Sequence, residues 1–510
     1  MLPNIGLTGM VQRTNATSVG SPTCRSKEGV RRIKAARGRR CVADVERKIG
    51  LSTKSSLTNP KRWFVALAVA VAAVVVMSPV SAGALGLPPG IQVVSPPASI
   101  VTDCSVDVTK PLYDWLNSLP EGTSSAPTEI LFASNGCYQI DGMLYLRGFN
   151  DFVFNGNGST FKQSTVVNGE LLKDPPRTGS PNCGSSQFPN GSGSTPLKMD
   201  IMWFIEGGCD LVFENMNVQG INANGNGGTQ KVQDAGIQLS GVQRAVVTND
   251  TIDSVWGDFI TVTGLHEAPF GGITLPSLDI TIENNSMKAS GRQGVTVVYG
   301  QRVSVTGNTL RGNIPDSAID LEADSSGGTE ADILIDNNTM DGYTWLLSAK
   351  TEARFYDIAF TNNTVRSFEV RMNPLTSTNG HDVTFSDNTS EHAVAWSLAY
   401  NLSLNNLATV LVSGNTALMQ PPAQTFVHVG RRHVSTDIAV QDNTLSPSPA
   451  ASANFLPIPL HAAPNIKATE CNNQTSSGTA LDDQHPNRLR CVTSTPVQPA
   501  APALPVYASP

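Results

Sequence analysis

Short segments in which apolar and polar residues alternate recur along much of the chain. The segments "ITIENNSM", "VSVTGNTL" and "ILIDNNTM" share an apolar–x–apolar start, an Asn, and a following Thr or Ser. Alternation with a period of two is typical of a β-strand, since successive side chains point to opposite faces. Nine such segments predict one repeating structural unit. Their aligned turn positions are Asn285, Asn308, Asn338, Asn363, Asn388, Asn415 and Asn443, with Asp250 in the same place.

The spacing of these turn positions predicts how the units are joined. Successive positions lie 23 to 35 residues apart, which fits one strand–turn–strand coil plus a loop of variable length. A single coil buries its aliphatic side chains only by stacking on neighbouring coils. We expect the turn Asn residues to tolerate left-handed backbone and their stacked side chains to form a ladder. The pattern predicts an all-β parallel β-helix of about 10 coils, with a β-sandwich of chance similarity as the alternative.

A helical pattern precedes the repeat, in the segment "DVTKPLYDWLNSL". Asp107 or Thr109 can cap its first turn, and Pro111 suits that turn. An amphipathic helix here would cover the first coil, whose open strand edges would otherwise pair with other chains. Its apolar stripe consists of Val108, Leu112, Trp115, Leu116 and Leu119.

Composition divides the chain into four predicted parts. Residues 1–61 are basic and without periodicity, and we expect them to be disordered. Residues 62–84 contain an uncharged apolar run and end in Ala82-Gly83-Ala84, which is typical of a signal peptide or, if uncleaved, a signal anchor. Residues 100–445 are assigned to the β-helix, and residues 446–510 to a Pro/Ala-rich tail with a disulfide loop. The protein is therefore expected to be secreted or on the cell surface.

Charge narrows the choice of partners. The first 62 residues carry 14 Lys and Arg and 3 acidic residues, although the whole chain has a net charge of −7. The acidic remainder argues against a nucleic-acid partner, whose phosphates require Lys and Arg. It is compatible with a neutral polysaccharide, or with an acidic one if a cation intervenes. We expect a monomer.

Cysteine usage agrees with export. Cys24 and Cys41 precede the apolar run, and six cysteines follow it, an even number that suggests disulfides. No C-x-x-C pair occurs in the sequence, which argues against a zinc or redox cysteine site. Pairing between neighbours is expected, and gives Cys104–Cys137, Cys183–Cys209 and Cys471–Cys491.

The order of motifs near the start of the repeat resembles that of a known family. After "DVT" and the helix come "GCYQI", "LYLRG" and "FNGNG", as in right-handed parallel β-helix proteins of the pectin-lyase-like superfamily. The coils "VWGDFITV", "SGRQGVTVV" and "AIDLEAD" resemble those of a group of secreted actinobacterial proteins. The resemblance covers residues 104–445 and implies a right-handed coil and a polysaccharide partner. The superfamily includes lyases, hydrolases and epimerases, which place acids and a base on adjacent coils of an outer face.

Alignment of three coils by their turn positions identifies one outward patch. Thr261, Thr296 and Asp320 point outward in adjacent coils, and Glu322 follows two residues later. Asp258, Arg292, Asp320 and Glu322 are the candidate catalytic residues, because acids and an Arg on adjacent coils suit acid/base chemistry on a sugar. Gln293, Trp256, His266 and Tyr299 are candidate substrate-binding residues beside them. The inward residues of the same strands are Ile260, Val262, Val295, Val297, Ile319 and Leu321.

Three roles for this patch remain open. In hydrolysis, one carboxyl group protonates the leaving oxygen and another activates water or attacks. In elimination or C5 epimerisation of a uronic acid, a base removes a proton while Arg292 or Ca²⁺ neutralises the substrate carboxylate. The carboxylates of Asp258, Asp320 and Glu322 are the candidate Ca²⁺ ligands. In the third role the patch only binds glycan on a non-catalytic surface rod.

Three motif differences set this chain apart from the pectinase branches of the superfamily. The pectin-hydrolysing branch has a G-D-D motif, where this chain has Gly257-Asp258-Phe259, and a G-H-G motif, which this chain lacks. The R-x-P-x-x-R motif of the pectate-lyase branch is absent as well. Asp258 and Arg292 therefore also fit ordinary structural roles, as a turn cap and as a salt bridge between coils.

Overall fold

The structure is a computed structural model that describes residues 90–505 with internal gaps. Residues 81–510 form one compact unit. The predicted N-terminal region (1–61) and signal segment (62–84) lie outside the described residues. No helix in the described part of the chain is long and apolar enough to span a membrane. The gaps are residues 166–200, 223–233, 267–272, 313, 316, 324–328, 342, 350–353, 367–369, 375–379, 393–399, 405–406, 422–423, 430–435, 450, 452–454, 463–465 and 482–498.

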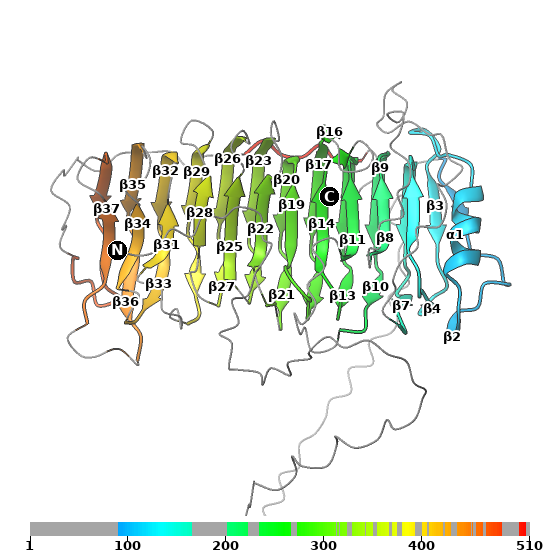
Figure 1. Ribbon diagram of the computed structural model, residues 1–510, viewed down its shortest axis with the longest axis horizontal. Coiled ribbons are helices and arrows are strands. Elements are labelled where there is room, and N and C mark those ends of the chain that lie inside the picture. The colour runs from blue at the N-terminus through cyan, green and yellow to red at the C-terminus, as the bar shows by residue number, and fades with distance from the viewer. Residues whose placement is uncertain are drawn as a thin grey trace, which may run out of the picture. The chain divides into compact units, whose positions relative to one another are not determined.

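Almost all regular elements are strands that pair in parallel in three long sheets (Figure 1). We name the sheets by the number of strands that the described residues contribute. The 13-strand sheet contains β1 (Gln92–Val94), β3 (Thr128–Leu131), β6 (Asn150–Asn155), β9 (Cys209–Glu214), β12 (Gln243–Thr248), β17 (Ser277–Glu283), β20 (Gly300–Thr306), β23 (Thr329–Asp336), β26 (Arg354–Thr361), β29 (Gly380–Ser386), β32 (Ala408–Ser413), β35 (Thr436–Gln441) and β38 (Ala468–Cys471).

The second and third sheets repeat the same coil order. The 12-strand sheet contains β2 (Asp103–Asp107), β4 (Cys137–Gln139), β7 (Thr160–Lys162), β10 (Asn217–Gln219), β13 (Thr251–Asp253), β18 (Ser286–Lys288), β21 (Thr309–Arg311), β24 (Thr339–Met340), β27 (Thr364–Val365), β30 (Thr389–Ser390), β33 (Thr416–Met419) and β36 (Thr444–Pro447). The 11-strand sheet contains β5 (Leu144–Arg147), β8 (Ile201–Glu206), β11 (Ala235–Ser240), β14 (Asp258–Thr263), β19 (Val295–Val298), β22 (Ser317–Ala323), β25 (Tyr343–Ala349), β28 (Val370–Pro374), β31 (Tyr400–Leu404), β34 (Thr425–Val429) and β37 (Ile458–Ala462). A small antiparallel pair, β15 (Leu265–His266) and β16 (Ile273–Leu275), stands apart.

Each coil passes through the three sheets in turn, as β12, β13 and β14 do. The next coil repeats the order with β17, β18 and β19, and every strand pairs with its counterpart one coil away. The predicted right-handed parallel β-helix is therefore confirmed, and its 11-strand sheet gives slightly more coils than the predicted number. The inward residues form one continuous apolar core, in which Ile260, Val295 and Ile319 are completely buried.

The predicted ladder of turn residues is present. The side-chain oxygen of each turn residue accepts a hydrogen bond from the backbone N–H of the turn residue one coil earlier, at 2.9 to 3.1 Å. Each Asn amide also donates to a strand carbonyl, as Asn338 Nδ2 does to the carbonyl of Val305 at 2.8 Å. The ladder therefore satisfies buried backbone groups that a turn cannot satisfy by itself. It comprises Asp250, Asn285, Asn308, Asn338, Asn363, Asn388, Asn415, Asn443 and Asn473.

The left-handed backbone lies one residue earlier than predicted. The residue before each ladder position has a φ of 53° to 66°, as in Asn284, Gly307 and Asp387. The ladder residues themselves do not have positive φ. This explains the recurring pairs N-N, G-N and D-N: the first residue tolerates left-handed backbone, and the second forms the ladder.

The β-helix extends beyond the predicted boundary at residue 445. β37 pairs with β34, β38 pairs with β35, and Asn473 adds a further step to the ladder. Leu460 and Ile466 are buried in the core. The predicted boundary at residue 445 is therefore too early. The Pro/Ala-rich composition after residue 445 concealed one more coil in the sequence.

The predicted capping helix is present as α1 (Thr109–Ser118), which lies at the end of the stack (Figure 1). Its Leu112 and Leu116 are completely buried, and Trp115 packs against the core. Asp107 Oδ1 accepts hydrogen bonds from both the backbone N–H and the hydroxyl of Thr109. The N-cap residue is Val108, which makes no side-chain cap hydrogen bond, so the cap predicted at Asp107 or Thr109 is wrong by one residue; Asp107 lies just before the cap and still accepts from the first N–H of the helix.

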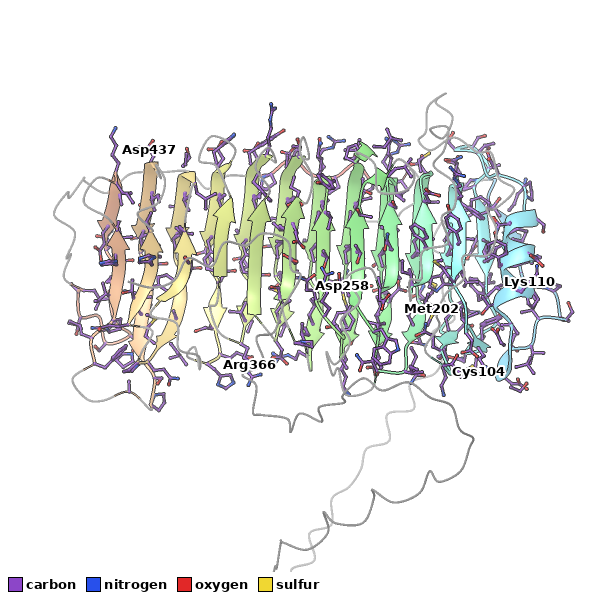
Figure 2. The ribbon with its side chains drawn as sticks, in the orientation of Figure 1. Cys104, Lys110, Met202, Asp258, Arg366 and Asp437 are labelled. Carbon is purple, nitrogen blue, oxygen red and sulfur yellow. A yellow bond between two sulfur atoms is a disulfide. The ribbon has the colours of Figure 1, made fainter. Side chains whose placement is uncertain are left out.

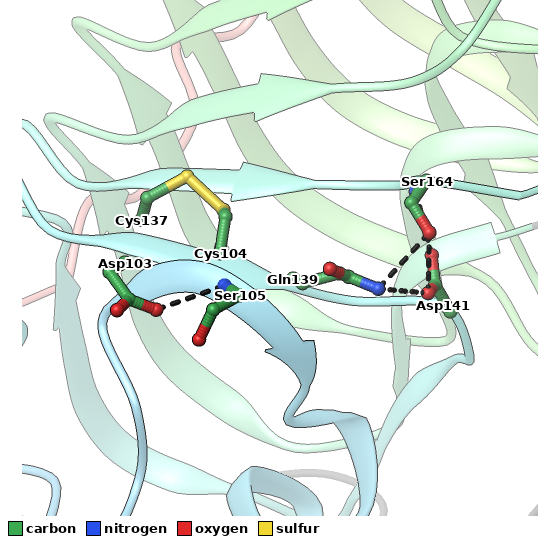
Figure 3. Close-up of a disulfide and its surroundings, with 7 residues drawn as sticks. All are labelled: Asp103, Cys104, Ser105, Cys137, Gln139, Asp141 and Ser164. Atoms are coloured by element: carbon green, nitrogen blue, oxygen red, sulfur yellow. Dashed lines mark hydrogen bonds between the residues drawn. A yellow bond between two sulfur atoms is a disulfide. The ribbon is translucent and has the colours of Figure 1, made fainter.

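A disulfide joins Cys104 of β2 to Cys137 of β4, as predicted (Figure 3). Nearby, Asp141 accepts hydrogen bonds from Gln139 and Ser164. Cys209 and Cys471 are also disulfide-bonded. The predicted pairs Cys183–Cys209 and Cys471–Cys491 each include one cysteine outside the described residues, so these pairings stay predictions.

Asp250 is the one acid in the ladder as the structure describes it. Its Oδ1 accepts from the N–H of Met216 at 2.8 Å, and its buried Oδ2 has no hydrogen-bond partner. Burial raises the pKa of this carboxyl group well above its ordinary value. A protonated carboxyl group has one acceptor and one donor oxygen, as the amide of Asn has one acceptor and one donor. We conclude that Asp250 takes the place of an Asn in its neutral form.

The substitution Asp250→Asn tests this conclusion. A carboxyl group with a raised folded-state pKa contributes stability that is present below its unfolded pKa and is lost as the pH rises through the folded pKa. Asp250→Asn should therefore raise the free energy of unfolding at pH 7 by about 1–3 kcal/mol, and by less near pH 4. Denaturant titration at the two pH values measures this. The reverse change, Asn338→Asp, should destabilise more at the higher pH, and equal effects at both pH values would contradict the conclusion.

Candidate functional site

Three strands of the 11-strand sheet carry the predicted patch in the predicted register. Thr261 of β14 pairs with Thr296 of β19, which pairs with Asp320 of β22. Asp258 is the first residue of β14, within the stack (Figure 2). Arg292 and Gln293 lie in the turn that leads into β19. Residues from three coils thus meet at the starts of β14 and β19 and in the middle of β22.

Close approach of the backbones brings the turns into contact. Gly291 N donates to the carbonyl of Gly257 at 3.0 Å, and Arg292 N donates to the same carbonyl at 3.1 Å. A Cβ atom at Gly257 would lie 1.8 Å from the carbonyl oxygen of Asp234, and one at Gly291 would lie 1.7 Å from that of Trp256. Only glycine fits at such distances, so these two glycines place Arg292 directly over Asp258.

Arg292 bridges two acids from different coils. Its Nε lies 3.3 Å from Asp258 Oδ1, and one terminal nitrogen lies 3.9 Å from Asp320 Oδ2. The two acids are 2% and 0% exposed, and Arg292 is 8% exposed. A buried charge is costly unless it is paired and hydrogen-bonded. The guanidinium therefore compensates two carboxylates that the fold brings together.

Gln293 and Thr296 complete the network. The side-chain oxygen of Gln293 accepts from Arg292 Nε at 2.8 Å, and its amide nitrogen donates to Asp320. The backbone N–H of Gln293 donates to Asp258 Oδ1 at 3.1 Å. The hydroxyl of Thr296 lies 2.7 Å from Asp258 Oδ2 and 2.8 Å from the side-chain oxygen of Gln293, and can donate to either. We call Asp258, Arg292, Gln293, Thr296 and Asp320 the Arg292 network.

The remaining predicted residues differ in their placement. Glu322 is half-buried on β22, two residues beyond Asp320 and so on the same face. Trp256 is half-buried beside Gly291, and its buried indole N–H has no hydrogen-bond partner. Tyr299 differs from the prediction: it is 1% exposed within the apolar core and presents no ring face to solvent. The backbone of His266 lies in β15, but its side chain is outside the described part.

The metal prediction concerns Asp258, Asp320 and Glu322. Within the described ranges, no group of three or more His, Cys, Asp or Glu residues is arranged to hold a metal ion. Arg292 already lies against both aspartates. Calcium binding by these three carboxylates stays a prediction.

A second polar cluster on the same sheet was missed from the sequence. Tyr145 of β5 donates its hydroxyl to Glu206 of β8, and Arg147 Nε lies 3.2 Å from Glu206 Oε2. The ring of Tyr145 stacks on Phe204 with 5.0 Å between centroids. Phe204 is in register with Gln238, which is in register with Thr261. Alignment of "LYLRG" with "WFIEG" one coil later would have revealed this cluster, but more than 50 residues separate the two segments in sequence.

Comparisons with known proteins concern the fold. Residues 203–340 match the protein family described as "Right handed beta helix region". Similar solved structures include an endo-xylogalacturonan hydrolase from Aspergillus tubingensis, at 10% identity and a TM-score of 0.42, over 79% of this chain and 99% of that one. A GH87 alpha-1,3-glucanase catalytic unit from Streptomyces thermodiastaticus has 15% identity and a TM-score of 0.36, over 78% and 71%. PfbA, a surface adhesin of Streptococcus pneumoniae, has 11% identity and a TM-score of 0.39, over 73% and 89%. A search of curated proteins finds no match.

Removal of the bridging cation tests the energetic role of the Arg292 network. Arg292→Met should lower the free energy of unfolding by about 3–5 kcal/mol, because it leaves two buried carboxylates without their cation. Arg311→Met is the control: the Arg311 side chain is 43% exposed in its ion pairs with Asp341 and Glu391. An exposed pair contributes about 0–1 kcal/mol. Chemical denaturation of both variants provides the comparison, and equal losses would contradict a special role for Arg292.

Proposed function

We propose that this chain, a right-handed parallel β-helix protein, is exported and acts on a polysaccharide at the outer face of its 11-strand sheet. The acting surface extends from the start of β14 across β19 to Asp320 in the middle of β22 and Glu322 in its second half. The observation that carries the proposal is the convergence of two acids, from different coils, on one arginine and one glutamine. Export is supported by the uncharged apolar run within residues 62–84, which starts at Trp63, and by the Cys104–Cys137 disulfide.

The exposure of each acid suggests a division of labour. Asp258 and Asp320 are buried and engaged with Arg292, so they position the surface rather than contact a large substrate. Glu322 is half-buried on the face that Asp320 shares, and is the acid proposed to contact the substrate. Acid/base chemistry at a sugar requires such a carboxyl group within hydrogen-bond reach of the reacting atom. Trp256 is half-buried in the turn before β14, and its ring is proposed to stack on a sugar; its indole N–H is buried.

The second candidate is a non-catalytic glycan-binding or surface rod. The burial and internal hydrogen bonding of the Arg292 network favour it, because such a network stabilises the contact between coils without any substrate. Under this alternative the surface binds glycan through Glu322 and Trp256 and turns over none. Affinity electrophoresis in glycan-containing gels detects binding without turnover.

A panel of neutral and uronic polysaccharides distinguishes the two candidates. Unsaturated products indicate elimination, and new reducing ends without them indicate hydrolysis. Glu322→Gln should lower kcat/KM by about 100-fold or more, since it removes the proposed acid/base group. The matched control is Glu283→Gln, which changes a half-buried Glu at the end of β17 on another sheet. Failure of the wild-type protein to cleave any substrate, or full activity of Glu322→Gln, would rule out the enzymatic proposal.

Chelation tests the calcium prediction. If the carboxylates of Asp258, Asp320 and Glu322 hold Ca²⁺ for a uronic substrate, EDTA should abolish activity, and added Ca²⁺ should restore it. Activity that is unchanged in EDTA assigns the neutralising role to a protein group, for which Arg292 is the candidate.

A further inference from the structure

A row of side chains follows the outer edge of the 13-strand sheet, one from each coil. Each row residue has a φ of 52° to 58°. Each is also left out of the regular strand pairing: Arg244 and Asp279 lie between the pairs Gln243–Leu278 and Ala245–Ile280. The bulge turns each of these side chains away from the core. The row consists of Asp151, Asp210, Arg244, Asp279, Arg302, Asp332, Asp357, Asp382, Thr409 and Asp437.

Every second member of this row is an aspartate. Starting from the second member, these are Asp210, Asp279, Asp332, Asp382 and Asp437, and we call them the aspartate row. Asp437 lies at an edge of the stack, whereas Asp258 lies within it (Figure 2). Two of the alternate coils carry arginines, and each pairs with the aspartate before it. Arg244 binds both oxygens of Asp210, at 2.8 and 2.6 Å, and Arg302 binds both oxygens of Asp279, at 2.6 and 2.8 Å.

The C-terminal residues 499–505 lie against this row. Ala503 N donates to Asp279 Oδ1 at 2.9 Å, and Ala500 N lies within 3.3 Å of Asp332 Oδ1. The contacts join residues 224 and 168 positions apart in the sequence. The segment therefore runs along the stack from later to earlier coils, and Figure 1 shows it in red across the ends of the strands.

The spacing of the two contacts matches a polyproline II conformation. Pro499, Pro502 and Pro505 recur at every third residue, and Ala501 and Leu504 each precede a proline, which favours extended or polyproline II backbone. This conformation has three residues per turn and a rise of about 3.1 Å per residue, so N–H groups three residues apart lie about 9.3 Å apart on one side. Two coils span about 9.5 Å, from a strand spacing of 4.7–4.9 Å. One N–H per turn thus meets one aspartate in every second coil.

We propose that the aspartate row is a binding surface for a proline-rich segment in the polyproline II conformation, and that residues 499–505 of this chain are its occupant. Recognition uses the backbone N–H of the residue after a proline, at Ala500 and Ala503. A proline is therefore tolerated at the other positions of each turn and excluded at these two. This role is independent of the proposed polysaccharide surface, which lies on the 11-strand sheet.

The electrostatics of Asp279 support a persistent contact. Burial raises the pKa of its carboxyl group. The hydrogen bonds from Arg302 and from the N–H of Ala503 lower the pKa by more than burial raises it, so the pKa lies below its ordinary value. The acceptor therefore stays ionised under mildly acidic conditions, and a hydrogen bond to an ionised acceptor is stronger than one between neutral groups.

Two proline substitutions in the full chain test the recognition rule. Ala503→Pro keeps the polyproline II preference but removes the N–H that donates to Asp279, whereas Ala501→Pro stiffens the segment and leaves both donors. Hydrogen exchange of the C-terminal peptide, followed by mass spectrometry, reports whether the amide of Ala500 stays protected. Ala503→Pro should accelerate this exchange by about 10-fold or more, and Ala501→Pro should leave it unchanged or slower. Equal exchange in the two variants would overturn the proposal.

A second pair of variants tests the surface itself. Asp332→Ala removes the acceptor for Ala500 and should accelerate the exchange of residues 499–505 to a similar degree. Asp357 lies in the next coil, between Asp332 and Asp382, and is not part of the aspartate row. Asp357→Ala should therefore leave the exchange of residues 499–505 unchanged. Full protection in Asp332→Ala, or equal deprotection in both variants, would contradict recognition by every second coil.

Discussion

The hydrogen-bond ladder between successive coils is the interaction on which the rest of the structure depends. A tight turn between short strands leaves backbone groups that the turn cannot satisfy, and burial against the next coil removes water from them. The amide of Asn338, for example, links the N–H of Asn308 to the carbonyl of Val305 and so joins consecutive coils. Because every coil repeats this contact, the coils stack in a fixed register. Asp250 takes the first described position of this ladder, where burial raises the pKa of its carboxyl group and so favours the neutral form that an Asn resembles.

A fixed register has a chemical consequence, since residues far apart in sequence become neighbours one strand spacing apart. Asp258 and Asp320 are 62 residues apart in the numbering, yet both lie against Arg292. The Arg292 network and the aspartate row follow the same principle on two different sheets. On the 11-strand sheet the acids and the arginine converge and are buried. On the 13-strand sheet two arginines pair with single aspartates of the coil before, and the row binds a segment of the chain itself.

The two surfaces differ in how they use charge. Burial makes the Arg292 network an all-or-none arrangement, in which loss of one partner leaves the others uncompensated. The contacts of the aspartate row with residues 499–505 instead depend on a match between the period of the coils and the period of the segment. A catalytic or glycan-binding role near the Arg292 network therefore requires the half-buried residues Glu322 and Trp256. Binding at the aspartate row requires only that the aspartates recur at every second coil.

Local patterns in the sequence were sufficient to predict the coil, the ladder positions, the capping helix and the outward pairing of Thr261, Thr296 and Asp320. These features depend on strand alternation and on turn chemistry, which act over a few residues. The sequence did not reveal that Asp320 and Arg292 are buried, that Tyr299 packs in the core, or that Ala503 reaches Asp279. Those outcomes depend on how closely coils approach at Gly257 and Gly291 and on where a distant tail finds room. Only the stacked structure decides them, because burial and long-range contact are properties of several coils together and not of any one segment.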